Sequence, residues 1–148
     1  MSESQANQPR PSSYFDLHTE GIGYLNRVRE VKPKKGEPFL ACSISAMRGE
    51  AGSVEFTRFD VRVTGALAIQ AVQGLRQDVE AKKAVIIGFR IGDLFVDTFV
   101  YDKDTQYHKK GDLGVMLKGR LLKIGFAKVD GQSLELPGSE PADQKAAA

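Results

Sequence analysis

The sequence predicts a mainly β protein: a small closed five-stranded barrel with one α-helix between its third and fourth strands. Three observations support this fold. Several segments alternate apolar and polar residues with a period of two, as half-buried strands do. One segment after Gly65 repeats its apolar residues at three- and four-residue spacing, as an amphipathic helix does. Two long strand segments follow, and closing them into a barrel would leave few open edges.

The first two strands are expected at residues 14–31 and 39–47, separated by a turn rich in proline, glycine and lysine. Gly21 and Gly23 lie inside the first strand, where a strand bends or another backbone approaches closely. Cys42 falls on the apolar face of the second strand. It is therefore expected to be a small core residue and not a nucleophile.

The third strand, residues 55–63, has the clearest alternation, because Phe59 and the two following valines alternate with charged residues. The other face of this strand carries Phe56, Arg58, Asp60, Arg62 and Thr64. After Gly65 the period changes, and a helix is expected to continue to about residues 82–83.

Residues 84–101 are expected to form one long strand or a pair of strands, and residues 113–129 the strand that closes the sheet. A polar loop joins them at residues 102–112. Phe89 and Phe126 share faces with aliphatic residues, so they are assigned to the core together with Phe59. Apolar residues occupy both faces further along, which leaves core and surface positions open for three rings, those of Phe95, Phe99 and Tyr101.

Length and composition favour one soluble domain. The chain has 148 residues, of which 41% are hydrophobic and 27% charged, as is usual for a globular protein. We expect disordered tails at residues 1–13 and 132–148 around a domain at residues 14–131. The single cysteine excludes a disulfide framework, and neither a membrane span nor a secretion signal is evident. The expected location is the cytoplasm, without membrane association.

Four stretches carry a resemblance to a known family: YFDLHTEGIGYLNRVREV, FDVRVTG, IGFRIGDLFVDTF and LKGRLLKI. They resemble replication-associated proteins of integrating conjugative elements. More widely, RFDVRVTG, the helix and AVIIGFRIG resemble bacterial single-stranded-DNA-binding proteins with an OB-fold. The resemblance implies an OB-fold barrel that binds single-stranded DNA as a homo-oligomer, a dimer or a tetramer, in the replication or transfer of a mobile element. Replication proteins would be further partners, and no cofactor or catalysis is implied.

Single-strand binding requires rings on which bases stack and cations that follow the phosphate backbone. The chain contains no tryptophan, so the stacking role falls to phenylalanine and tyrosine. The candidate rings are Phe56, Phe95, Phe99, Tyr101 and Tyr107. The candidate cations are Arg58, Arg62, Arg90, Lys109 and Lys110, with Lys32, Lys34 and Lys35 in the first turn.

Other interpretations remain open at this point. Arg58 and Arg62 could instead pair with Glu55 and Asp60, or with residues of neighbouring strands, on an ordinary solvated face. The barrel could also serve as a protein-interaction or assembly module of the same machinery, without significant DNA binding. An enzyme is disfavoured, because no pair of residues has the spacing of a nucleophile and base or of a metal site.

Overall fold

The computed structural model describes residues 15–136. The expected N-terminal tail lies outside this range, as does the expected C-terminal tail from residue 137 onward. The elements are β1 (His18–Val31), β2 (Phe39–Arg48), the short 3₁₀ helix η1 (Ala51–Ser53), β3 (Glu55–Val63), α2 (Ala66–Glu80), β4 (Val85–Val100), β5 (Leu113–Val129) and β6 (Gln132–Leu134).

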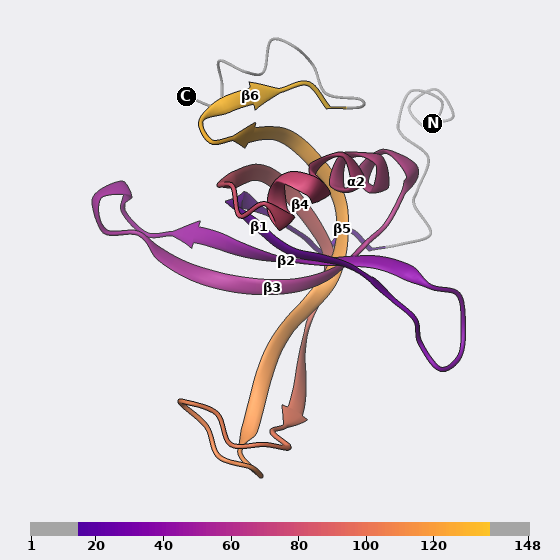
Figure 1. Cartoon of the computed structure of the whole chain (residues 1–148), viewed down its shortest axis with the longest axis vertical. Coiled ribbons are helices and arrows are strands. Elements are labelled where there is room, and N and C mark those ends of the chain that lie inside the picture. The colour runs from indigo at the N-terminus through magenta and orange to yellow at the C-terminus, as the bar shows by residue number, and fades with distance from the viewer. Residues whose placement is uncertain (1–14, 137–148) are drawn as a thin grey trace, which may run out of the picture.

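The strands form a closed barrel of OB-fold type, as predicted (Figure 1). Neighbouring strands follow the order β3-β2-β1-β4-β5, and a parallel pairing of β3 with β5 closes the ring. The helix lies between the third and fourth strands in the chain. Closure gives each strand of the barrel two neighbours over part of its length, which removes most open sheet edges.

The barrel interior is filled by aliphatic side chains and two rings. Ile44, Ile87 and Leu121 are fully buried. The rings of Phe59 and Phe89 meet edge to face with centroids 6.1 Å apart, a favoured arrangement for aromatic pairs. The alternation of β3 therefore has the predicted sense: its phenylalanine and valines at odd positions face the core.

The helix α2 begins directly after Gly65, whose φ of 98° suits a residue without a side chain. Its buried residues recur at helical spacing and are Ala68, Ala71, Val72 and Leu75. This face packs mainly on β1 and β5, so the helix covers one end of the barrel core. Within residues 15–136, no helix has the length and apolar character needed to cross a membrane.

The strand β1 changes partner along its length, pairing first with β4 and then with β2. Gly23 lies where the two pairings overlap. A Cβ atom there would lie 2.5 Å from the carbonyl oxygen of Ser45, so only glycine allows the strands to approach this closely. The predicted close approach of another backbone is confirmed at this residue.

Two expectations about the end of β5 are wrong. Phe126 is only half buried and lies outside the core, because a β-bulge at Gly125 shifts the alternation: Gly88 pairs with Phe126, and Phe89 pairs with Ile124. Residues 132–134, expected in the disordered tail, form β6. Asp130 and Gly131, with φ of 49° and 87°, form the tight turn that allows β6 to pair with β5.

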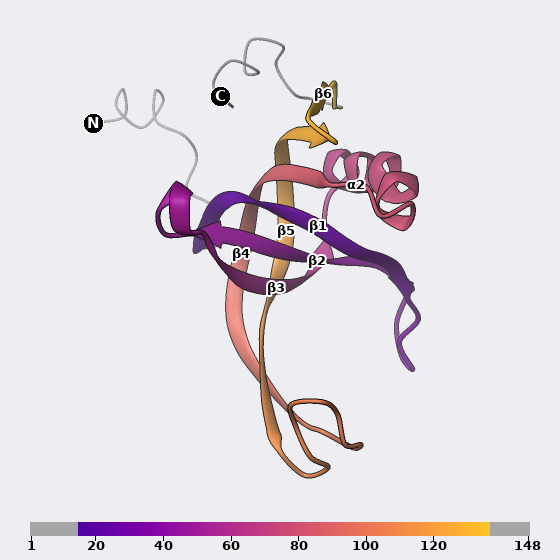
Figure 2. The same cartoon turned by 60° about the vertical axis from the view of Figure 1, so that its left-hand side comes forward.

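The hairpin of β4 and β5 extends well beyond the barrel (Figures 1 and 2). We call residues 95–118 the arm. From Phe95 to Val100, β4 has lost its pairing with β1, and from Leu113 to Met116, β5 has no pairing with β3. The arm is therefore a two-stranded ribbon for most of its length.

Candidate nucleic-acid interface

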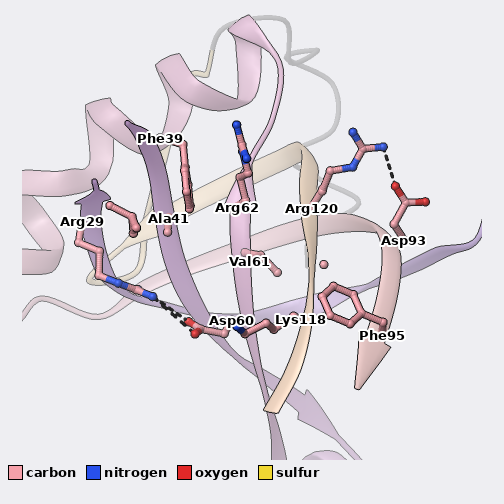
Figure 3. Close-up of a pocket in the computed structure, with 12 residues that line it drawn as sticks. Arg29, Phe39, Ala41, Asp60, Val61, Arg62, Asp93, Phe95, Lys118 and Arg120 are labelled. Atoms are coloured by element: carbon pink, nitrogen blue, oxygen red, sulfur yellow. Dashed lines mark hydrogen bonds and ion pairs between the residues drawn. The ribbon is translucent and has the colours of Figure 1, made fainter. Parts of the chain in front are cut away.

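A groove of about 380 Å³ lies on the outer face of the barrel and crosses β2, β3 and β5 (Figure 3). Its lining side chains come from the end of β1, the start of β2, the second half of β3, and the parts of β4 and β5 near the base of the arm. Four cationic side chains and two carboxylates line it, which gives a surplus of two positive charges; they are Arg29, Arg62, Lys118 and Arg120, and Asp60 and Asp93.

Arg62 is the cation of the groove that has no acidic partner among the described residues. Its guanidinium carbon lies 4.3 Å from the centre of the Phe39 ring, a cation–π contact worth about 0.5–1 kcal/mol at an exposed site. The ring supports the guanidinium without neutralising it. A charged group with free N–H donors therefore faces the groove.

Arg62 and Arg120 occupy paired positions on the parallel strands β3 and β5. Figure 3 shows Phe39, Arg62 and Arg120 side by side on three strands. Like charges at paired positions of a sheet destabilise it. Here the repulsion between the two arginines is only partly relieved, because Arg120 pairs with Asp93 at 2.6 Å whereas Arg62 has no such pair among the described residues. The remaining repulsion favours an anion over this pair of strands.

Asp60 is the carboxylate beneath the groove, and its hydrogen bonds fix its position. It accepts a hydrogen bond from the buried Ser43 hydroxyl at 2.9 Å and pairs with Arg29 at 3.2 Å. Arg29 reaches it across β2 because a β-bulge in β1, with Arg27 at a φ of 51°, redirects the chain. The pairing of Arg62 with Asp60, one of the open interpretations, is therefore wrong.

Arg58 also lacks an acidic partner in the described part of the chain, since Glu55 pairs with Arg48 at 2.7 Å. Its guanidinium donates a long hydrogen bond of 3.5 Å to Ser43. It lies one row further along the outer face than Asp60, at a small crevice beside Met116 on β5. Arg58 therefore extends the cationic surface from the groove toward the arm.

The rings whose orientation the sequence left open all lie outside the core. Phe95 pairs with Lys118 at the base of the arm, lines the groove, and keeps 54% of its surface exposed. Phe99 lies across Gly114 on the same face, where a Cβ atom would collide with the ring. Glycine at position 114 therefore leaves the space that the Phe99 ring occupies on this face of the ribbon.

The row of rings continues to the end of the arm. Tyr101 lies 4.9 Å from Phe99 and stacks on His108, with centroids 4.3 Å apart and planes 13° from parallel. Side chains of paired strands alternate between faces, so this face of the arm continues the outer face of the barrel. We call the rings of Phe95, Phe99, Tyr101 and His108 the ring face of the arm.

Several predicted residues lie outside the groove. Phe56 is half exposed at the start of β3, with its ring 6.1 Å from that of Tyr24. Arg90 pairs with Glu20 at 2.5 Å and lines other hollows, on β1 and beside α2. Exposed positions at the arm tip hold Tyr107, Lys109 and Lys110, and exposed positions in the turn between β1 and β2 hold Lys32, Lys34 and Lys35.

Among the cations and rings of the groove, sequence reasoning missed four: Arg29, Phe39, Lys118 and Arg120. For two of them a signal existed, since Lys118 and Arg120 alternate with leucines in the stretch LKGRLL. The contact of Phe39 with Arg62 depends on the register of β2 against β3, and that of Arg29 on the bulge in β1. Neither can be read from local periodicity.

The side chains that could ligate a metal ion, and the single cysteine, complete the description of the site. Within residues 15–136, no three His, Cys, Asp or Glu side chains lie close enough together to hold a metal ion. Cys42 is fully buried, and this burial raises the pKa of its thiol to about 12. The thiolate, which is the reactive form, is thus strongly disfavoured.

A family described as a protein of unknown function (DUF3577) matches residues 8–140. The chain belongs to this family. No curated protein sequence matches it. Among solved structures, a mitochondrial single-stranded-DNA-binding protein from S. cerevisiae is similar, with 10% identity and a TM-score of 0.37 over 80% of this chain and 99% of that one. The OB-fold assignment rests on the strand order of the chain itself.

Proposed function

We propose that the chain binds single-stranded DNA in the groove and along the ring face of the arm, with little dependence on base sequence and without catalysis. The proposal rests mainly on the surroundings of Arg62. This cation has no acidic partner in the described residues, its guanidinium lies on the Phe39 ring, and it is paired in register with Arg120. A phosphate above these two strands would relieve the repulsion between the two arginines.

The rings supply the second requirement of single-strand binding. Phe95 is exposed at the point where the groove meets the arm, and Phe99 and Tyr101 continue the same face. A base stacked on such a ring contributes about 1–3 kcal/mol and does so for any base, because every base has a flat face. Cations and rings together thus form one path of the kind that an unpaired strand requires.

The cellular setting is a second part of the proposal. The sequence resemblance to replication-associated proteins of integrating conjugative elements supports a role in the replication or transfer of a mobile element. In that setting the chain would act as a homo-oligomer, a dimer or a tetramer, and meet replication proteins on the DNA. The lysines of the first turn and of the arm tip would add long-range attraction for the strand.

The test is fluorescence anisotropy of a labelled oligo-dT strand, and of a duplex of equal length, across a salt series. We expect tighter binding to the single strand, with affinity that falls steeply as salt rises because counterions are released. Arg62→Ala should weaken binding roughly tenfold, about 1.4 kcal/mol, and reduce the slope of log affinity against log salt by about 0.7.

The matched control is Arg76→Ala, which removes the same charge from α2, where Arg76 pairs with Glu80 at 3.1 Å. It should leave affinity within about twofold, because Arg76 does not line the groove. Equal losses of DNA affinity in the two variants would show that the effect of Arg62→Ala comes from net charge alone. Weak binding of both DNA forms by the unaltered chain would contradict the proposal and favour the alternative, a protein-interaction or assembly module.

A further inference from the structure

The arm has a second face, opposite the ring face, that is almost purely aliphatic. Its three cross-strand pairs are Val96 with Leu117, Thr98 with Val115, and Val100 with Leu113. We call these six residues the aliphatic face. Leu117 packs against the barrel core, but Val96, Val100, Leu113 and Val115 are each between 61% and 65% exposed. This is a continuous apolar surface on a ribbon that extends away from the barrel.

A ribbon of this kind is marginally stable in water without a further strand or a packing partner. Its outer part, beyond the last pairing with β3, is held by the contact of Phe99 with Gly114 and by the stack of Tyr101 on His108. Both contacts belong to the ring face. The aliphatic face makes no equivalent contact in the described residues, and an exposed apolar surface of this kind marks a site of contact with another molecule.

We propose that a second copy of the chain covers it, aliphatic face against aliphatic face. DNA does not suit this surface, because the surface offers neither a ring nor a cation. The composition favours self-association: of the three cross-strand pairs, two are aliphatic on both strands. A copy related by a two-fold axis therefore meets apolar side chains whichever strand it faces, as a symmetric interface requires.

Charge also favours a second copy. Residues 95–118 contain four aspartates and four lysines, so the net charge of the arm is zero. None of these charged residues lies on the aliphatic face. Two arms can therefore approach without net repulsion, unlike two copies of the cationic groove.

The area is of the right order for a concentration-dependent dimer. A valine or leucine side chain buries roughly 60–120 Å² on full burial, so the four residues of the face that are 61–65% exposed offer about 150–300 Å² per copy. A stable interface of standard size buries about 800 Å² per partner. We therefore expect the dimer to dissociate on dilution, unless further surface near the arm adds to the contact.

One consequence rests on the proposed function. Because the ring face and the groove lie on the opposite side of the ribbon, a dimer formed in this way leaves the DNA path of each copy open. Self-association and DNA binding would then use different residues of the same arm, and the two activities can be separated by substitution.

The test is sedimentation equilibrium of the whole chain and of Val115→Glu, which places a charge in the middle of the aliphatic face. The original chain should self-associate, and the substitution should raise its dissociation constant at least tenfold. The control is Leu67→Glu, at a residue of α2 that is 57% exposed; its association should match that of the original chain. Circular dichroism checks that each variant is folded.

A second variant tests the contact directly. Cys42 is the sole cysteine and is buried, so Thr98→Cys introduces one reactive thiol at the aliphatic face. A short bis-maleimide should join two copies there, and should not do so with Gln73→Cys on α2. A chain that stays monomeric at high concentration, or equal cross-linking at both positions, would overturn the proposal.

DNA binding distinguishes this proposal from the proposed function. A short oligo-dT of about eight nucleotides occupies one barrel, so avidity between copies does not affect the result. Val115→Glu should bind it within about twofold of the original chain. If Val115→Glu lost both DNA binding and self-association, the two faces of the arm would not be independent. Self-association without DNA binding in any variant would contradict the proposed function alone.

Discussion

The barrel and the arm are built from the same two strands, β4 and β5, but they are stabilised in different ways. In the barrel each strand has neighbours on both sides, and Ile87 and Leu121 on these strands are fully buried. In the arm both outer edges are open, and the exposed residues include Val100 and Val115. The shape of the barrel therefore follows from its buried core, whereas the arm leaves its surface available for contacts.

The largest expected difference between the two parts is in stability. Ile44→Ala removes a side chain with no exposed surface and should lower the free energy of unfolding by about 2–5 kcal/mol, because it leaves a cavity in a closed core. Val100→Ala in the arm should cost less than about 0.5 kcal/mol in the monomer. Urea denaturation at low protein concentration measures both. A cost above about 1 kcal/mol for Val100→Ala would show that the arm is packed as the barrel is.

The next prediction concerns Asp60, which links the barrel to the groove. Asp60→Asn removes the charge that pairs with Arg29 and weakens the hydrogen bond from Ser43. We expect a loss of about 1–3 kcal/mol in unfolding free energy, since both partners are partly or fully buried. Affinity for oligo-dT should rise, because the groove loses a negative charge. Lower stability together with lower affinity would show that Asp60 chiefly positions Arg29 for the DNA.

The elements of the fold could be predicted from the sequence because their periods are clear. The alternation at Phe59 and the helical spacing at Ala68, Val72 and Leu75 each correspond to one buried face. The error at Phe126 has a local cause, since one unpaired residue at Gly125 reverses the faces beyond it. Alternation identifies a strand, but it cannot follow a bulge that the partner strand determines.

The site could be predicted only in part, because it depends on pairs of strands. Arg62 was recognised from its own strand, whereas its support by Phe39 and its register with Arg120 require the pairings of β3 with β2 and β5. Arg90 shows the same dependence: its strand is as predicted, but the neighbouring strand supplies Glu20 as an acidic partner that periodicity does not reveal. Whether a cation is available to a ligand is decided by its neighbours across the sheet.

The smallest expected effect is at Asp97, on the arm next to the groove. Hydrogen bonding and charge from Lys118, 2.9 Å away, hold the pKa of this carboxyl below its usual value of 3.8. The pKa of Asp97 is thus lower in the folded state than in the unfolded state. The ion pair therefore stabilises the arm above pH 3.8, and this stabilisation is lost as the pH falls through the lowered pKa.

The measurement is a carboxyl titration by NMR of the original chain and of Lys118→Ala. In the variant the pKa of Asp97 should rise toward 3.8, because both of its largest causes are gone. Global stability should hardly change, since the pair is exposed to solvent and screened. An unchanged pKa would mean that the arm is too mobile in solution to hold the pair, and the ring face next to it would then lose the fixed geometry on which base stacking depends.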